Sequence, residues 1–228
     1  VQRHVIVRKL DSLEALGAVT NICSDKTGTL TQGRMVAKRA WLPSLGTYSV
    51  GASNEPLNPE DGELSLIAEP PVKLGEEKLG DVSSPDDLLK DNDTLKDFLN
   101  VTAMANLAHL HQSATEGWQA RGEPTDIAIQ VFASRFNWGL SRWTKGDKPI
   151  WQQQAEYPFD STVKKMSVIF TKRDDNNSGK SREMIFTKGA VERVLEACTT
   201  IKWKPDSEPV PINDEIRDEI LENMEALA

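Results

Sequence analysis

The sequence predicts a mixed α/β fold of the α+β kind, with an antiparallel sheet flanked by helices. Two strand-like stretches, 164–172 and 183–188, are joined by a linker of turn-forming residues, which is typical of an antiparallel hairpin. Apolar residues recur at helical spacing within 94–111, 124–138 and 213–227. Because apolar sheet and helix faces must cover one another, these elements predict helices packed on a sheet.

Local signals support the predicted helices. Pro124 suits the first position of a helix, where a missing N–H costs nothing. Asn213 can cap the last helix, and Asp214 with Glu215 places negative charge in its positive first turn. A shorter helix is predicted over 189–198, where four apolar residues keep the helical period.

The N-terminal part of the chain has a different character. Helical spacing over 10–17 is followed by a short apolar stretch, 18–24, that predicts a buried strand. A further extended stretch is predicted over 34–50. Residues 51–94 are rich in Pro, Gly, Asn, Asp and Glu, and this composition predicts a long surface excursion.

The composition is that of a globular protein. Of the 228 residues, 38% are hydrophobic and 27% are charged, and the formal net charge is −8. This acidity argues against the basic face with which proteins bind nucleic acid or anionic membrane surfaces. Cys23 and Cys198 lack a metal-ligand spacing and have apolar neighbours, which predicts two buried thiols. No apolar run approaches the ~20 residues of a membrane helix, and the N-terminus has no signal-peptide pattern.

A polar turn follows the predicted strand 18–24. Asp25 stands just past the strand, where reacting groups collect in open α/β sheets. A carboxylate there can attack phosphorus and hold an acyl phosphate. Lys26 can neutralise phosphate charge, and Thr27 with Gly28 supplies a hydroxyl and a tight turn. An isolated aspartate at this place would be an ordinary turn or cap residue.

The string from Cys23 to Thr31 is more specific than its aspartate alone, because it resembles without a gap the phosphorylation signature of P-type cation-transporting ATPases. The resemblance implies that Asp25 is the phosphorylated nucleophile, with Lys26 and Thr27 in the catalytic site. It also implies that Asp25 and Thr27 form part of a Mg²⁺ site.

The same resemblance implies a division of the chain into parts. Residues 1–18 would connect the membrane stalk to the head. Residues 19–40 would begin a Rossmannoid phosphorylation domain of the haloacid-dehalogenase type, and 41–228 would be the nucleotide-binding domain. The resemblance is weakest across 51–94.

Three further stretches resemble the family's ATP pocket: 122–126, 157–168 and 187–190. The resemblance implies that Phe159 stacks on adenine and that Lys164 and Lys188 supply positive charge. Three wall residues would complete the pocket, namely Met166, Gly189 and Ala190. Taken singly, Phe159 would be a core residue and the two lysines solvated strand residues. Their ordered succession after Asp25 favours an ATP site.

The sequence departs from the family pattern in two places. Ser161 stands where the family usually has an arginine. The family's glutamate that contacts the adenine amino group has no clear equivalent, and Gln112, Ser113 and Glu116 lie in the region where we expect it. Trp118 is the tryptophan that we place at the border of the pocket.

Two nearby histidines, His109 and His111, are predicted to be helix-face residues and not metal ligands, because no acidic or thiol partner has a suitable spacing.

The second half of a phosphorylation domain is not recognisable in the sequence. The string Gly-Asp-Gly-x-Asn-Asp, which in the family completes the Mg²⁺ site, does not occur. We therefore expect the chain to bind ATP with Mg²⁺ but not to be catalytically complete, and we expect the last strands of the nucleotide domain to lie past residue 228.

Among P-type ATPases, the strings 24–35 and 8–11 most resemble the fungal sodium-efflux pumps. The resemblance implies a cytoplasmic portion of a multi-pass protein, of the plasma membrane, that exports sodium and binds the cation elsewhere. Its partners would be ATP and the remainder of the same transporter. A calcium-transporting pump is the alternative.

Two other classes remain open as alternatives. A soluble phosphatase of the same superfamily usually carries a second acid two residues after the nucleophile, and that position is Thr27. A non-catalytic nucleotide-binding module would not need the intact turn at Asp25.

Overall fold

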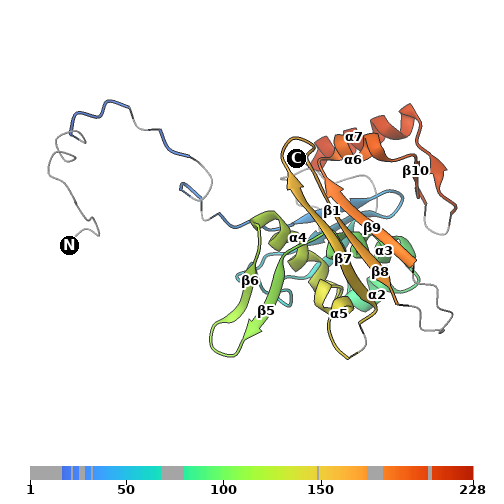
Figure 1. Ribbon diagram of the computed structural model, residues 1–228, viewed down its shortest axis with the longest axis horizontal. Helices are drawn as coiled ribbons and strands as arrows, with labels where there is room; N and C mark the ends of the chain where they lie inside the picture. Colours follow the sequence, from blue (N-terminus) through green and yellow to red (C-terminus); the bar gives the residue numbers. More distant parts are fainter. Residues whose placement is uncertain are drawn as a thin grey trace. The chain divides into compact units, whose positions relative to one another are not determined.

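The structure is a computed structural model of the 228-residue chain (Figure 1). It describes residues 17–21, 23–25, 29–31, 33–67, 80–147, 149–173, 182–204 and 207–227. The chain divides into two units, Val1–Arg34 and Met35–Ala228, and each is described by itself.

The described residues of the first unit form no strand. Residues 18–21 and 23–25 are exposed, so the prediction of a buried strand over 18–24 is wrong for them. A strand is stable only when its backbone groups pair with a neighbour, and no described residue pairs with this stretch. Cys23 is an exposed free thiol, which also corrects its predicted burial.

The second unit begins with a four-stranded antiparallel sheet in the order β1-β2-β3-β4. Its strands are β1 (Arg39–Leu42), β2 (Gly46–Val50), β3 (Leu64–Ile67) and β4 (Asp81–Val82). The predicted extended stretch 34–50 is thus a hairpin of β1 and β2. The excursion 51–94 contains two strands and a short helix, α2 (Pro85–Leu89), and so has more regular structure than its composition indicates.

A second, three-stranded antiparallel sheet has the order β7-β8-β9. Its strands are β7 (Trp151–Asp160), β8 (Lys165–Lys172) and β9 (Arg182–Gly189). The hairpin of β8 and β9 confirms the sequence prediction, while β7 was not predicted. Met166, Val168 and Phe170 alternate with less buried residues along β8, as the side-chain period of a strand requires.

Helices α3 (Asp93–Met104) and α4 (Pro124–Arg135) pack on each other, and α3 also contacts β9 (Figure 1). Leu95 and Leu99 of α3 belong to a core formed with the four-stranded sheet and α4. Met104 at the end of α3 belongs to a second core, beneath the three-stranded sheet. Helix α3 therefore contributes to both cores.

A hairpin of β5 (His109–Ser113) and β6 (Gly117–Arg121) follows α3. The predicted helix 94–111 is therefore too long, and His109 and His111 are exposed strand residues and not helix-face residues. The helix ends because Asn106 bonds to its surroundings, its side-chain Oδ1 accepting from the Ala108 N–H at 2.8 Å.

The remaining elements are α5 (Leu140–Thr144), α6 (Val191–Ala197), β10 (Thr200–Ile201), β11 (Val210–Pro211) and α7 (Asp214–Leu227). The predicted cap of the last helix is confirmed, because Asn213 Oδ1 accepts from the Ile216 N–H at 2.8 Å. Cys198 is exposed at the end of α6, against its predicted burial. In the described residues, every helix is too short or too polar to cross a membrane.

Candidate nucleotide site

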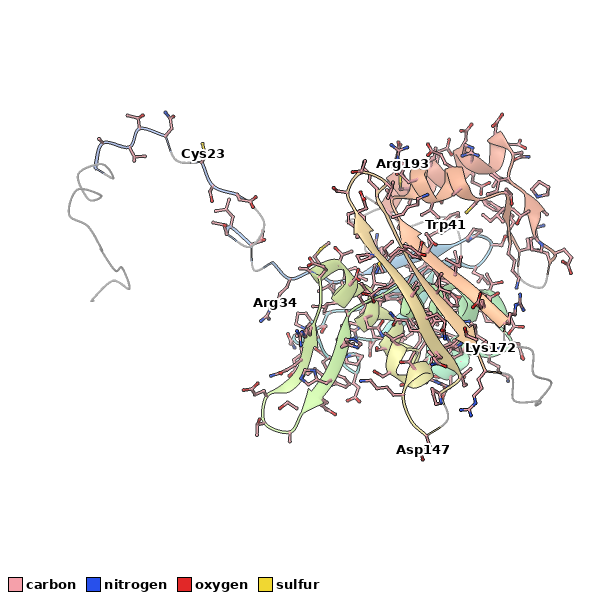
Figure 2. The ribbon with its side chains drawn as sticks, in the orientation of Figure 1. Cys23, Arg34, Trp41, Asp147, Lys172 and Arg193 are labelled. Atoms are coloured by element: carbon pink, nitrogen blue, oxygen red, sulfur yellow. The ribbon has the colours of Figure 1, made fainter. Side chains whose placement is uncertain are left out.

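Two of the predicted pocket segments meet at one end of the three-stranded sheet, through the register of its strands. Lys165 at the start of β8 pairs with Asp160 of β7 on one side and with Gly189 of β9 on the other. Met166, the next residue, pairs with Lys188. Figure 2 shows Lys172 and Arg193 towards opposite ends of this sheet, and the site lies at the Arg193 end.

Phe159 lies in a β-bulge. Between the pairs Tyr157–Ser167 and Asp160–Lys165, β7 has two residues where β8 has only Met166. A bulge of this kind bends its strand and redirects a side chain. Phe159 is 62% exposed, and an exposed aromatic side chain is available for stacking. Phe159 thus lies in the bulge beside Met166, which in turn pairs with Lys188 of β9.

Lys164 lies in the turn between β7 and β8, in the left-handed region with φ 52°. Its N–H donates to the Asp160 carbonyl at 2.7 Å. The Asp160 carboxylate accepts from the N–H groups of Thr162 at 2.6 Å and Val163 at 3.4 Å. The Lys164 side chain is exposed, and its ammonium has no ion-pair partner in the part of the chain that the structure describes.

Gly189 lies against the turn that carries Lys164, and its place in the wall of the ATP pocket stays a prediction. A Cβ atom at this residue would lie 2.3 Å from the Lys164 carbonyl oxygen and 2.9 Å from the Lys165 Cα. The Ala190 N–H donates to the same carbonyl at 3.0 Å. The glycine therefore makes room for the neighbouring turn of the chain itself. Both Gly189 and Ala190 fix the backbone of Lys164 against the end of β9.

Lys188 forms an ion pair with Asp126, and the Nζ to Oδ1 distance is 2.7 Å. The two side chains are 19% and 14% exposed. Burial lowers the pKa of Lys188, because it disfavours the charged form, while the hydrogen bond and the charge of Asp126 oppose that shift. The third predicted segment, 122–126, thus joins the site through the first turn of α4.

Asp126 was not predicted as a site residue. Besides Lys188, its carboxylate accepts from the Leu107 N–H at 3.2 Å, and its carbonyl accepts from the Asn106 amide at 2.9 Å. Asn106 is buried, so the end of α3 holds the start of α4 in place. The available signal was an acidic residue in the first turn after Pro124, within the string 122–126 that the resemblance already assigned to the pocket.

Met166 and Lys188 lie on the core side of the sheet. Met166 is buried and packs in the second core. Lys188 also lines an apolar pocket of about 230 Å³ between β1, α3 and α4, together with Phe98, Val101 and Phe132. Met166 therefore supports the site from below and presents little surface of its own.

The predicted phosphorylation turn lies in the first unit. Asp25 is exposed, while Lys26 and Thr27 lie outside the described residues. The described residues contain no group of three His, Cys, Asp or Glu side chains that could hold a metal ion. They do not supply a Mg²⁺ site, and the partial site at Asp25 and Thr27 stays a prediction.

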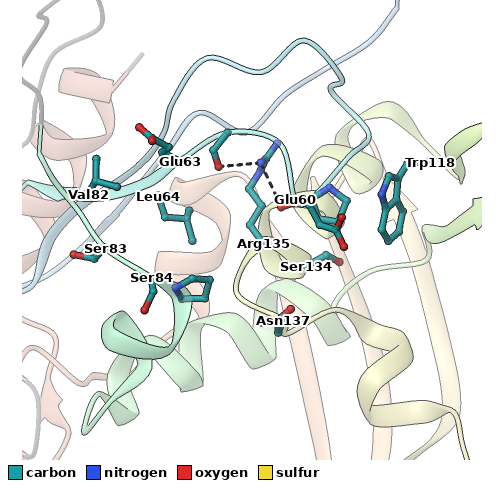
Figure 3. A pocket seen from close by; sticks show the side chains of 13 residues that line it. Glu60, Glu63, Leu64, Val82, Ser83, Ser84, Trp118, Ser134, Arg135 and Asn137 are labelled. Atoms are coloured by element: carbon teal, nitrogen blue, oxygen red, sulfur yellow. Dashed lines mark hydrogen bonds between the residues drawn. The ribbon is translucent and has the colours of Figure 1, made fainter.

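A separate pocket of about 540 Å³ lies beneath the loop that precedes β3 (Figure 3). Trp118, which we expected at the border of the ATP pocket, lines this pocket with Arg135. The buried Arg135 guanidinium donates from Nη1 to the carbonyls of Pro59, Asp61 and Gly62. Arg135 therefore holds the loop, and the pocket contains none of the predicted ATP-contacting residues.

The family model of the P-type ATPase cytoplasmic domain N matches residues 94–228, which is more than half of the chain. The chain belongs to the P-type ATPase family. The model covers α3, the paired sheet β7-β8-β9 and every predicted ATP-contacting residue. The observed mixture of helices and antiparallel sheet confirms the predicted fold class for a P-type ATPase nucleotide-binding domain.

Several curated P-type ATPases are similar to this chain. A sodium/potassium exporting P-type ATPase of Schizosaccharomyces pombe is 40% identical over 227 residues, covering 100% of this chain and 20% of the relative. Sodium/potassium exporting P-type ATPase 1 of Saccharomyces cerevisiae is 38% identical over 251 residues, covering 94% of this chain and 22% of the relative. A probable calcium-transporting ATPase of Trypanosoma brucei brucei is 29% identical over 238 residues, covering 100% of this chain and 22% of the relative. The chain spans about a fifth of the length of these relatives.

Proposed function

We propose that residues 35–228 of this P-type ATPase bind ATP at the end of the sheet formed by β7, β8 and β9. The observation that supports this site is the strand register at that end, which brings together the bulge of β7 with Phe159, the turn with Lys164 and the end of β9 with Lys188. Together they offer an exposed aromatic ring and two cations, which are the groups that an adenine ring and a triphosphate require.

Each of the three side chains has a role that follows from its surroundings. Phe159 stacks on the adenine ring, because the bulge exposes its face while Met166 supports the strand behind it. Lys164 contacts the phosphates, because its exposed ammonium is a mobile point charge. Lys188 contacts the purine end of the nucleotide, since Asp126 holds its ammonium in a half-buried place.

Asp126 provides the acceptor that an adenine amino group needs. Its two carboxylate oxygens bind Lys188 and the Leu107 N–H, and each oxygen keeps a second lone pair. Guanine carries a carbonyl at the position of that amino group, and a carboxylate facing a carbonyl is repulsive. We therefore assign to Asp126 the contact for which the sequence offered no clear residue, and expect ATP to bind more tightly than GTP.

In the whole protein, Asp25 accepts the γ-phosphoryl group. A carboxylate oxygen of Asp25 forms a bond to the γ-phosphorus, and the bond from that phosphorus to the β–γ bridging oxygen breaks. ADP leaves with the electron pair of the broken bond. Support comes from the string 23–31 and from the exposure of Asp25. The test is ³²P-ATP labelling of the whole protein, with Asp25→Asn as the variant that must lose the label.

The whole protein then couples ATP hydrolysis to export of monovalent cations, sodium first. This proposal is supported by the names of the relatives that are 38% and 40% identical, whereas the relatives named calcium-transporting ATPases are 29–31% identical. The remainder of the transporter would bind the cation and hold the protein in the plasma membrane. Stimulation of its ATPase activity by Na⁺ and not by Ca²⁺ is the expected result, and the reverse would favour the calcium pump.

The ATP site is tested by calorimetric titration of the chain with ATP. We expect a Kd between tens of micromolar and millimolar, about −4 to −6 kcal/mol, and loss of binding in Phe159→Ala. The matched control is Tyr157→Ala, because Tyr157 is an aromatic residue of the same strand with nearly equal exposure, 60% against 62%. Equal affinity of all three proteins, or no binding by the wild type, would contradict the proposed site.

A further inference from the structure

The turn between β7 and β8 carries an aspartate that no part of the proposed site accounts for. The Asp160 carboxylate is exposed and touches no cation in the part of the chain that the structure describes. It is bonded instead to the backbone of its own turn, through the N–H groups of Thr162 and Val163. A negative charge beside Lys164 would also repel a triphosphate, so the charge itself brings no benefit to ATP binding.

We propose that Asp160 is a positioning residue of the ATP site, which fixes the turn from which Lys164 reaches the nucleotide. This inference rests on the proposed ATP site and adds to it a residue that acts only through Lys164. Its basis is the geometry of the turn and the attachment of the turn to β9.

The first part of the argument is the backbone of Lys164. Its φ of 52° is in the left-handed region, which is unfavourable for a residue with a side chain. Such a conformation persists only where neighbouring bonds hold it. The two bonds to the Asp160 carboxylate and the bond from the Lys164 N–H to the Asp160 carbonyl are those bonds. Acceptance of the same backbone bonds also lowers the pKa of Asp160.

The second part is the attachment of the turn to β9. The Lys164 carbonyl accepts from the Ala190 N–H at 3.0 Å, in the space left by the missing side chain of Gly189. The Lys164 backbone is thereby joined to the strand end that carries Lys188. Asp160 holds the turn on one side and β9 holds it on the other, so the Lys164 backbone is fixed in one position. This reduces the conformational entropy that is lost when the Lys164 side chain binds phosphate.

The test is a series of substitutions at Asp160, measured by calorimetric titration of the 228-residue chain with ATP. Asparagine keeps the accepting oxygen, serine accepts more weakly from a shorter side chain, and alanine removes the acceptor. We expect Asp160→Asn to bind ATP within about twofold of the wild type, Asp160→Ala to bind about tenfold more weakly, and Asp160→Ser to lie between them.

A double-mutant cycle separates positioning from general structural support. In the Lys164→Met background, Asp160→Ala is expected to change ATP affinity by less than about twofold, because there is no ammonium left to position. An undiminished effect of Asp160→Ala in that background, an unchanged affinity of the single variant, or failure of asparagine to restore binding would overturn the inference. If Asp160→Ala does not fold, the ATP affinities of Asp160→Ser and Asp160→Asn are compared instead. A weaker affinity of the serine variant supports the inference, and equal affinities overturn it.

The inference and the proposed site can fail separately. If the wild type does not bind ATP, or Phe159→Ala binds it as well as the wild type does, the site itself is wrong. If Phe159→Ala and Lys164→Met weaken binding but the Asp160 series has no effect, the site stands and Asp160 has no role in it.

Discussion

The ammonium of Lys188 and the carboxylate of Asp126 lie 2.7 Å apart, although the two residues belong to different elements, β9 and α4. The pair joins the end of the sheet to the first turn of a helix and is supported by Asn106 at the end of α3. It is the one recorded ion pair between described residues in which both side chains are less than a fifth exposed. It therefore serves both the fold and the proposed nucleotide site.

Replacement of Asp126 by asparagine should destabilise the chain, because it leaves the Lys188 ammonium half-buried without its counter-charge. Removal of one partner of a buried pair costs up to 3–5 kcal/mol, and for this incompletely buried pair we expect about 2–3 kcal/mol. Urea unfolding of the two proteins measures the difference. The exposed pair of Lys96 and Asp93 is the control, where Asp93→Asn should lower the free energy of unfolding far less than Asp126→Asn does, because solvent screens an exposed pair.

Equal costs for Asp126→Asn and Asp93→Asn would contradict the assigned importance of the buried pair.

The pKa of Lys188 makes a prediction about alkaline pH. In the unfolded chain this amine has its ordinary pKa of 10.5, and in the folded protein the pKa is lower because of burial. Between the two values the unfolded chain binds more protons, so the free energy of unfolding rises with pH. Below the folded pKa both states are protonated, and the full cost of burying the ammonium is present.

The measurement is urea unfolding of the wild type and of Lys188→Met from neutral pH up to 10.5. The wild type should gain stability relative to the variant as the pH rises through the folded pKa. A parallel pH profile for the two proteins would show that Lys188 has the same pKa folded and unfolded.

The strand pairing at the site follows from sequence in part. The hairpin of β8 and β9 was predictable, because two stretches rich in strand-forming apolar residues stand on both sides of a linker with turn chemistry. The last helix was predictable from its cap, Asn213. The bulge at Phe159 was not predictable, because an extra residue in β7 can be recognised only when the register with β8 is known.

Other features depended on contacts that no local pattern contains. Ala105 and Ala108 continue the helical period of α3, but the Asn106 side chain bonds to the backbone and the chain turns into β5. The role of Asp126 depends on Lys188, which lies 62 residues later in the sequence. The closeness of Gly189 to the Lys164 carbonyl likewise depends on a contact between residues of different segments.

Gly189→Ala should disturb the site directly. The new Cβ would lie 2.3 Å from the Lys164 carbonyl oxygen, so the turn must move and the bond from Ala190 must lengthen. Overpacking of this kind costs about 1–3 kcal/mol, and we expect ATP affinity to fall with it.

Gly51→Ala is the matched control for Gly189→Ala, because the nearest atoms to a Cβ at residue 51 are 3.5 Å away. Urea unfolding and ATP titration of both variants check the prediction. If the two substitutions cost the same stability, the close contact at Gly189 is not what holds the turn.

Arg135→Met should loosen the loop that precedes β3. Methionine keeps the apolar contacts of the arginine stem but leaves the carbonyls of Pro59, Asp61 and Gly62 without their donor. We expect a loss of about 1–3 kcal/mol in urea unfolding and faster proteolysis within the loop. ATP affinity should not change, because no proposed ATP contact lines this pocket.

The control for Arg135→Met is Arg193→Met, which removes an exposed arginine whose recorded bond is to Glu196 at 3.3 Å and should change stability by less than about 0.5 kcal/mol. If Arg135→Met weakened ATP affinity without changing stability, the nucleotide would bind in the pocket lined by Arg135 and not at the proposed site.

The most direct test of the central claim is a map of backbone amide shifts in ¹⁵N-labelled chain titrated with ATP. We expect the shifts to gather at Phe159, Lys164, Lys188 and Asp126, and the amides at the far end of the sheet, around Lys172, to stay unchanged. Shifts that gather instead around Trp118 and Arg135, or at neither pocket, would contradict an ATP site at the end of β7, β8 and β9.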